Sequence, residues 1–383
     1  MATVVIVGAG IIGTSIAYHL AARGCTDVVI LEKEATEIRG STARAVAGVR
    51  HQFSAEVNVR LSLYSIERLE HFTEEIGGYA DLHQVGYLFL IDDSIVWQQY
   101  QQNVAMQQQL GARVELLKPV DVANIIPETY IDDLLGATFG SKDGYCDAHG
   151  IAAGYLKRAR ELGVQLRRDT TVTGFQIQGD RVVAVETNGC ELLPCEFVVN
   201  AAGPWAGAVA ELAGLHVYVK PYRRCVYMTE PVSAIRHPIP LTVDVGSGFY
   251  MRKELDNILF GMSNLAEPSS YDTMIDWEWL DTVLTSGLRR FPILEQVGLA
   301  EKLCWAGLYE ITPDAMPILG RHPELPNYVD ASGFSGHGIM HAPATGLLMA
   351  EEILDGQAKT IDIHDLRTTR FSNDVLTKER NVI

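Results

Sequence analysis

The stretch TVVIVGAGIIGTSIAYHLAARGCTDVVILEKE, residues 3–34, constrains the fold more than any other part of this chain. Residues 3–7 are a short β-branched run, which is typical of a buried parallel strand. Apolar residues then recur at helical spacing, and Gly24 stands where a glycine commonly ends a helix. Residues 28–31 form a second apolar run. A strand, a helix and a strand in this order predict an α/β fold with a parallel sheet.

Three glycines connect the first strand to the helix at G-x-G-x-x-G spacing: Gly8, Gly10 and Gly13. The first allows a tight turn, the second lets the backbone approach a pyrophosphate, and the third lets helix and strand pack closely. The free N–H groups at the start of the helix favour phosphate charge. Glu32, which ends the second strand, can accept hydrogen bonds from a ribose and disfavours a 2′-phosphate. The pattern predicts a site for FAD or NAD and argues against NADP.

Length and charge limit the classes of protein to which the chain can belong. Its 383 residues predict two or three domains, or one large discontinuous domain. The net charge of −17 argues against binding to nucleic acid. No apolar run reaches the ~18 residues of a membrane span, and the N-terminus lacks the basic region of a signal peptide. The six cysteines are scattered without a C-x-x-C pair, as free thiols are, so we expect a cytoplasmic location.

The rest of the chain alternates between helical, strand and loop patterns. The patterns predict helices near 55–76, 97–110, 150–163 and 276–290, and strands near 86–91, 222–230, 241–252 and 257–264. Turn dipeptides divide residues 164–200 into a β-meander. Residues 216–304 have the pattern of an antiparallel sheet with helices. From residue 305 glycine motifs return, and they lead into an amphipathic helix.

The segment GSTARAVAGVRHQF, residues 40–53, is rich in small residues and carries Arg44 and Arg50. Small residues let a backbone lie against a flat or charged ligand. The segment can also be the start of a helix capped by Ser41 or Thr42, and a capped helix start is itself an anion site. Both interpretations stay open at this point.

Six motifs together resemble one family. They are GAGIIG (8–13), GSTARAVAGVRHQF (40–53), GYLFL (86–90), VVNAAGPWA (198–206), WAGLYEITPD (305–314) and GFSGHGIMHAP (333–343). The chain resembles the FAD-dependent amine oxidoreductases of the D-amino-acid oxidase and sarcosine oxidase group over essentially its whole length. Its likeness is strongest to the β-subunits of heteromeric sarcosine oxidase and L-proline dehydrogenase.

The resemblance implies a two-domain layout. A Rossmann-type FAD-binding domain would be built from residues 1–85, 148–215 and 305–383. A substrate-binding domain with an antiparallel sheet would be inserted as residues 86–147 and 216–304. The coarse strand and helix patterns agree with this layout.

The resemblance also implies where FAD is held. Glu32 would hold the adenosine ribose, Ser41 and Thr42 would lie near the pyrophosphate, and Val172 would meet the adenine through its backbone. Residues 333–339 would wrap the pyrimidine end of the flavin, where N–H groups at a helix start can stabilise the negative charge of the reduced ring. The predicted FAD-binding residues are Gly8, Gly10, Ile11, Ile12, Gly13, Glu32, Lys33, Ser41, Thr42, Ala47, Gly48, Val49, Val172, Ala201, Ala202, Gly203, Trp205, Gly307, Gly333, Phe334, Gly336, His337, Gly338 and Ile339.

Three residues are candidates for catalysis on the substrate side: Arg50, Tyr250 and His337. Arg50 falls where related enzymes place an arginine for the substrate carboxylate, which a guanidinium fork suits; a structural ion pair is the alternative. Tyr250 falls near a tyrosine that lines the substrate side, and ordinary sheet packing is its alternative. His337 lies in the flavin loop, where a structural or cofactor contact is favoured over a general base. If Arg50 does not bind the carboxylate, then Arg223, Arg224 and Arg252 are further candidates.

His337 and His341 are four residues apart, as metal ligands on a helix can be. No third ligand is evident in the sequence, and Pro343 follows closely. We therefore predict no metal site.

The chain departs from related enzymes at four positions. Gly307 replaces the cysteine that tethers FAD in sarcosine oxidases, and Cys146 replaces a histidine that tethers FMN in some β-subunits, so we expect noncovalent FAD. Leu259 falls where oxygen-activating members carry a lysine, which favours a dehydrogenase over an oxidase. Met340 replaces a carboxylate-binding lysine of the monomeric sarcosine oxidases.

These residues predict an enzyme that oxidises the C–N bond of a small amino acid by hydride transfer to flavin, giving an imine. Sarcosine, proline, hydroxyproline, glycine and D-amino acids remain open as substrates, as does a partner subunit or an electron-acceptor protein. One alternative is an FAD-binding subunit or assembly protein with little catalysis of its own. An NAD-dependent dehydrogenase is disfavoured, because it has no use for the second glycine loop, GFSGHG.

Overall fold

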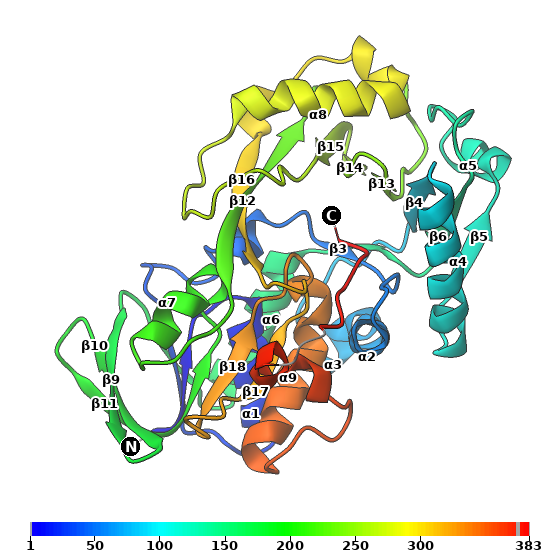
Figure 1. Ribbon diagram of the computed structural model, residues 1–383. Helices are drawn as coiled ribbons and strands as arrows, with labels where there is room; N and C mark the ends of the chain where they lie inside the picture. Colours follow the sequence, from blue (N-terminus) through cyan, green and yellow to red (C-terminus); the bar gives the residue numbers. More distant parts are fainter. Residues whose placement is uncertain (1, 373–375, 383) are drawn as a thin grey trace.

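The computed structural model describes residues 2–372 and 376–382, and its main feature is a pair of large sheets (Figure 1). In the first sheet β1 pairs in parallel with both β2 and β11. The strand order across this sheet is β17 (Ile318–Arg321), β18 (Tyr328–Ser332), β11 (Leu192–Asn200), β1 (Ala2–Val7), β2 (Val28–Leu31) and β8 (Gln165–Arg167). The β-meander continues from β11 through β10 (Arg181–Thr187) and β9 (Val172–Gln178).

Both faces of the first sheet are covered, which explains the continuous β-branched run of β1. Val4 and Ile6 face a helical layer, while Val5 and Val7 face the meander and α7. The helices of this part of the chain are α1 (Ile11–Ala22), α2 (Glu56–Glu70), α3 (Phe72–Ile76), α6 (Ala148–Glu161), α7 (Ala206–Glu211) and α9 (Gly338–Leu354).

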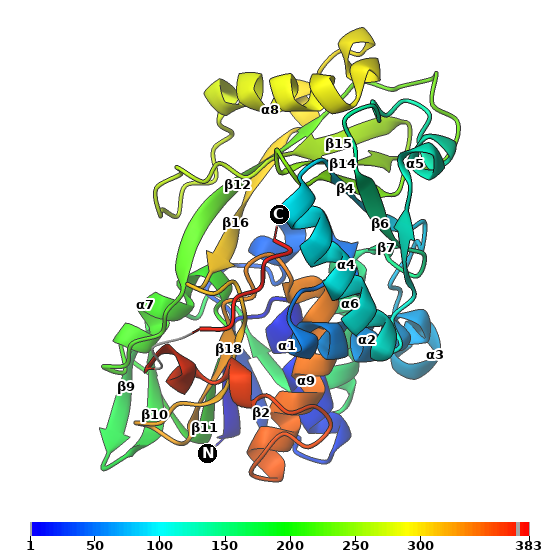
Figure 2. The same cartoon turned by 45° about the vertical axis from the view of Figure 1, so that its right-hand side comes forward.

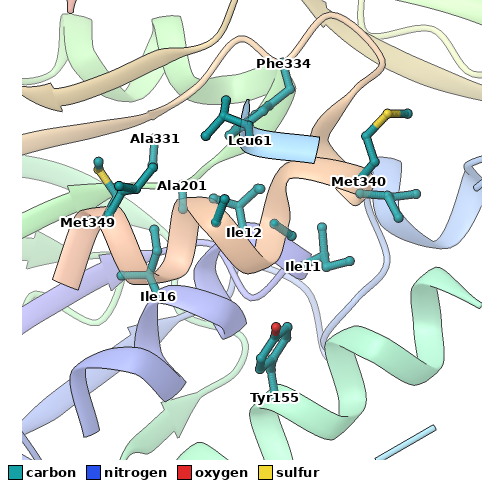
Figure 3. Packing of buried hydrophobic residues seen from close by; sticks show 14 of the residues in the cluster. Ile11, Ile12, Ile16, Leu61, Tyr155, Ala201, Ala331, Phe334, Met340 and Met349 are labelled. Atoms are coloured by element: carbon teal, nitrogen blue, oxygen red, sulfur yellow. The ribbon is translucent and has the colours of Figure 1, made fainter. Parts of the chain in front are cut away.

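The helical layer is packed most closely where α1 meets α9 (Figure 3). A Cβ atom on Gly346 of α9 would lie 2.2 Å from Oγ of Ser15 on α1. Oγ of Ser15 donates a hydrogen bond of 2.8 Å to the carbonyl of Ala342. The N-terminal halves of the two helices are thereby fixed relative to one another, and the first turn of each helix reaches the candidate site.

The second sheet is mostly antiparallel. Its order is β16 (Trp305–Ile311), β12 (Lys220–Met228), β15 (Asn257–Gly261), β14 (Phe249–Glu254), β13 (Leu241–Asp244), β4 (Tyr87–Ile91), β6 (Gly136–Gly140) and β5 (Val114–Leu117). Only the pair β4 and β13 is parallel among the described pairs of this sheet. The helices that accompany it are α4 (Ser94–Gln109), α5 (Pro119–Ile125) and α8 (Trp277–Arg290). Helix α8 lies across one face, on the side away from α1 and α9 (Figure 2).

The structure corrects three predictions of local structure. Residues 40–53 do not begin an α-helix: Ser41–Arg44 form a 3-10 turn, and β3 (Gly48–Val49) then pairs with β7 (Gly144–Tyr145). The strand predicted at 241–252 is two strands, β13 and β14, because the chain turns at 245–248. The helix predicted at 55–76 is interrupted at His71.

Strand β16 pairs with a strand of the other predicted domain. The division at residue 305 assigns β16 to the FAD-binding domain, yet it pairs with β12 along its whole length in the second sheet. The division into two domains stays a prediction. In the described part of the chain, we find no helix with the length and apolar character that a bilayer crossing requires.

Candidate active site

A cavity of about 960 Å³ lies where the two sheets meet, at the upper end of the volumes typical of ligand sites. The first sheet contributes the glycine turn after β1 and the Ala201–Gly203 turn after β11. The second sheet contributes Tyr250 from β14, with Arg224 and Tyr309 from β12 and β16. One cavity therefore joins the predicted nucleotide site to the predicted substrate side.

The turn after β1 and the first turn of α1 each have one position that admits only glycine. Gly8 has φ +107°, and a Cβ atom there would lie 2.5 Å from the carbonyl oxygen of Ala201. A Cβ atom on Gly13 would lie 2.0 Å from the carbonyl oxygen of Gly8. The glycines thus allow β1, α1 and the β11 turn to approach one another around the cavity.

The start of α1 is suited to hold a phosphate. Its N-cap, Gly10, brings no side chain, and its first turn holds no acidic residue. Oγ1 of Thr42 accepts a hydrogen bond of 3.1 Å from the Ile11 N–H, which leaves the neighbouring N–H groups and the positive end of the helix dipole facing the cavity.

Glu32 lies on the cavity wall at the end of β2. Its Oε2 accepts a hydrogen bond of 3.0 Å from the Ala9 N–H, and its Oε1 accepts one of 3.0 Å from the Glu34 N–H. These two bonds fix the carboxylate beside the glycine turn, where a ribose hydroxyl can donate to its remaining lone pairs.

Arg50 and His337 form a buried cluster at the other end of the cavity. Arg50 is 1% exposed and its Nη2 donates to Nε2 of His337 over 3.2 Å. The guanidinium also donates to the carbonyl oxygens of Gln52 and Asn381. Burial and the neighbouring charge of Arg50 lower the pKa of His337 well below its usual range. His337 is therefore a neutral acceptor.

Two tyrosines and a second arginine complete this end of the cavity. Burial raises the pKa of Tyr250 well above its usual range and also raises the pKa of Tyr309, so both stay phenols. The guanidinium of Arg224 lies 5.4 Å from the centre of the Tyr309 ring. In the β12–β16 pairing, Arg224 stands opposite Gly307.

The architecture and this site match one known family. The family model described as DAO, FAD dependent oxidoreductase, matches residues 3–352. The chain belongs to this family. FAD is therefore its cofactor, and the start of α1, the glycine turn and the fixed carboxylate of Glu32 fit a dinucleotide of this kind.

Known proteins resemble the chain over its full length. It is 30% identical to FAD-dependent oxidoreductase domain-containing protein 1 of Xenopus laevis, across 100% of this chain and 85% of that protein. It is 28% identical to human mitochondrial sarcosine dehydrogenase across 99% of this chain, but this covers only 42% of the dehydrogenase. The crystal structure of L-proline dehydrogenase from P. horikoshii superposes with a TM-score of 0.90 at 32% identity, covering 98% of this chain and 99% of that one.

Most predicted site residues line the cavity, including all three catalytic candidates. Four predicted FAD-binding residues are not among the lining residues. Gly13 packs against the turn, Val49 and Phe334 lie in the hydrophobic core, and Gly333 lies against Thr312. These four support the wall from behind, and the remaining FAD contacts stay predictions.

The four departures from related enzymes also have defined places. Gly307 and Met340 line the cavity, whereas Cys146 is buried outside the lining set. Leu259 is 1% exposed and packs in an apolar cluster with Tyr250, one layer behind the wall.

Tyr271 is a wall residue that the sequence analysis missed, since no motif marks it. Tyr271 comes from the loop after β15 and stacks on Trp205, with ring centroids 5.5 Å apart and planes at 12°. Nζ of Lys33 lies 3.4 Å from the centre of the Trp205 ring on the same wall. Such contacts join segments that are distant in sequence, so only the pattern of exposed aromatics in loops could have suggested them.

Glu310 is a further missed residue of the wall. Its Oε2 accepts a hydrogen bond of 3.1 Å from the Gly333 N–H, and burial raises its pKa to about 7. This carboxyl group therefore changes charge near neutral pH while facing the cavity.

No group of three or more potential metal-binding side chains meets at one point within residues 2–372 and 376–382. Nε2 of His341 lies 3.2 Å from Oγ of Ser62, and Nε2 of His337 is occupied by Arg50.

Proposed function

We propose that the protein oxidises the C–N bond of a small amino acid to an imine that water then hydrolyses. The observation that carries this proposal is the single cavity that runs from the glycine turn to the buried arginines and tyrosines. The names of two relatives, L-proline dehydrogenase and sarcosine dehydrogenase, point to the same class of substrate. FAD would supply the hydride acceptor.

The residues at the buried end would position the substrate and exclude water. Tyr250 and Tyr309 keep their protons, so they can donate hydrogen bonds without acting as bases. Nε2 of His337 already accepts from Arg50, which leaves it unsuited to remove a proton. A neutral amine needs no strong base, so the chemistry rests on orientation of the Cα–H bond.

The start of α9 would stabilise the reduced cofactor. Helix α9 begins at Gly338, and its N-cap, His337, forms no capping hydrogen bond through its side chain. The free N–H groups of the first turn lie at the cavity wall and favour negative charge there.

We further propose a dehydrogenase that passes electrons to a partner or acceptor protein, with FAD bound noncovalently. The apolar environment of Leu259 supports a dehydrogenase, and glycine at position 307 supports noncovalent binding of FAD. A cytoplasmic location stays a prediction, and one relative is named as mitochondrial.

Anaerobic bleaching of the bound flavin tests the proposed reaction. The purified yellow protein is mixed with sarcosine, proline, hydroxyproline, glycine or a panel of D-amino acids, and free FAD with the same compounds is the control. At least one amino acid is expected to bleach the protein-bound flavin within seconds to minutes. A yellow protein that none of them bleaches would favour the noncatalytic alternative.

A further inference from the structure

Arg224 is a half-buried cation that forms no ion pair with any described residue. Its Nη1 donates a hydrogen bond of 2.8 Å to the carbonyl of Arg223. Its Nε is buried without a partner, and no hydrogen bond or ion pair between described residues uses its Nη2. The edge formed by Nε and Nη2 is thus free, and this edge matches the two oxygens of a carboxylate.

The two neighbouring arginines differ from Arg224. Arg223, on the same strand, is held by Glu267, Asp272 and Asp276 and does not line the cavity. Arg50 does line the cavity, but its guanidinium is bound by two carbonyl oxygens and by His337. Of these three arginines, only Arg224 both lines the cavity and has N–H donors without a partner among the described residues.

The surroundings of Arg224 make a bound anion favourable. Nε of Arg224 is buried without a partner, so this part of the guanidinium has lost its hydration, and burial lowers the pKa of the group. An arginine nevertheless keeps its proton in proteins, so the cost of this desolvation falls when a carboxylate arrives. The ring of Tyr309, 5.4 Å away, and the phenol of Tyr250 flank the same space.

The position of Arg224 in the fold separates it from the expected site of the FAD diphosphate. The diphosphate site is the start of α1 in the first sheet, whereas Arg224 lies in the middle of β12 in the second sheet (Figure 1). Val226 and Leu241, both lining residues, provide apolar surface near this part of the wall. A small organic carboxylate with an apolar body fits these surroundings.

We propose that Arg224, rather than Arg50, binds the carboxylate of the substrate through its Nε–Nη2 edge. This inference rests on the proposed function and refines it: the substrate class is an amine that carries a carboxylate, and simple amines are rejected. Loss of the carboxylate would leave the buried guanidinium uncompensated, which is the physical source of the selectivity.

The test compares two probes that differ only in a carboxylate, pyrrole-2-carboxylate and pyrrole, by calorimetric titration of the FAD-loaded protein. The wild-type protein is expected to bind pyrrole-2-carboxylate at least about tenfold more tightly than pyrrole. Arg224→Gln should abolish this preference, and Arg224→Lys should restore part of it, because lysine returns the charge without the fork. The matched control Arg223→Gln should keep the wild-type ratio.

Each outcome decides the inference. Equal binding of the two probes by the wild-type protein, or an unchanged ratio in Arg224→Gln, overturns it. Loss of FAD in Arg224→Gln, with FAD retained in Arg223→Gln, also overturns it, because Arg224 would then hold the cofactor. If a variant does not fold, the comparison of the two probes on the wild-type protein still tests the inference. Since no turnover is involved, a failure of the proposed reaction shows separately, as an absence of bleaching.

Discussion

The guanidinium of Arg50 donates to Nε2 of His337 across 3.2 Å, and both residues are buried at the wall of the cavity. An arginine offers only donors, so Nε2 of His337 must be the acceptor and the ring proton must lie on Nδ1. The same guanidinium donates to the carbonyl oxygens of Gln52 and Asn381 and so joins residues 376–382 to the loop that carries His337. Through these hydrogen bonds, Arg50 holds together the segments that carry Gln52, His337 and Asn381.

Arg50→Met is therefore expected to destabilise the protein by about 2–4 kcal/mol, because it leaves two buried carbonyl oxygens and Nε2 of His337 without a donor. Denaturant unfolding monitored by tryptophan fluorescence gives the free energy of unfolding. Arg60→Met is the control: Arg60 forms an exposed pair with Glu56 and should cost less than about 0.5 kcal/mol. If Arg50→Met lowers the free energy of unfolding as little as the control does, the hydrogen bonds of Arg50 contribute nothing to stability.

Glu32→Gln should weaken FAD binding by about 1–3 kcal/mol, the effect of losing a charged hydrogen-bond acceptor. The amide oxygen of glutamine can still accept from the Ala9 N–H, so the turn itself should persist. Titration of the apoprotein with FAD, followed by quenching of flavin fluorescence, measures the affinity. Glu37→Ala is the control, because Glu37 pairs with Arg168 outside the cavity. Equal affinity in Glu32→Gln and the wild type would mean that another residue holds the ribose.

The contrast between these two residues shows what the sequence could predict. Glu32 belongs to the β1–α1–β2 unit, whose periodicity and glycine spacing are local, and the predicted strand at 28–31 has the observed bounds. The surroundings of Arg50 depend on contacts that are distant in sequence, such as its bond to Asn381. Likewise, residues 40–53 do not form an α-helix, and within them Gly48–Val49 pair as β3 with Gly144–Tyr145 of a remote strand. Local patterns carry no information on such pairings.

FAD is expected to leave the protein intact on acid precipitation. Gly307 faces Arg44 so closely that a Cβ atom there would lie 3.0 Å from Cβ of Arg44. A tethering side chain at this position would need the 3-10 turn of residues 41–44 to shift. After precipitation, the supernatant should hold all the flavin and the pellet should be colourless. Flavin fluorescence that stays with the denatured polypeptide would disprove noncovalent binding.

Asp330→Asn should stabilise the protein at pH 8 and have little effect at pH 4. Asp330 is fully buried in β18 beside Tyr328 and Asn200, and neither carboxylate oxygen has a hydrogen-bond partner among the described residues. Burial raises its pKa from 3.8 to about 7. Between these two values the folded state binds more protons than the unfolded state, so stability falls as pH rises through that window, by up to about 4 kcal/mol.

Unfolding free energies at pH 4, 6 and 8 measure this effect. The wild-type protein should lose stability across the series, whereas Asp330→Asn should lose less. Part of the slope should remain, because burial also raises the pKa of Glu310 to about 7. Asp256→Asn, at an exposed turn, should retain the wild-type slope. If the unfolding free energy of Asp330→Asn falls with pH as steeply as that of the wild type, the pKa of Asp330 is not raised.

Slow reoxidation by air is expected after reduction by substrate. Oxygen must first become superoxide, and a fixed cation near the flavin would stabilise that anion. Leu259 supplies none. Arg252 and Lys253 are not among the cavity-lining residues and donate to the carbonyls of Val46 and Ile235. Arg50 lines the cavity, but its guanidinium donates to two carbonyl oxygens and to His337. Arg224 does line the cavity, but a bound product carboxylate would offset its charge.

Stopped-flow mixing of the substrate-reduced protein with oxygenated buffer should therefore give a rate far below ~10 per second, a typical turnover rate, while an artificial dye reoxidises the protein faster. Leu259→Lys should raise the oxygen rate if the lysine chain reaches past Tyr250 into the cavity. Leu259→Met, which conserves volume without adding charge, is the matched control and should not raise it. Rapid reoxidation of the wild-type protein by oxygen would instead identify an oxidase, with Arg224 as the cation on the wall that could support it.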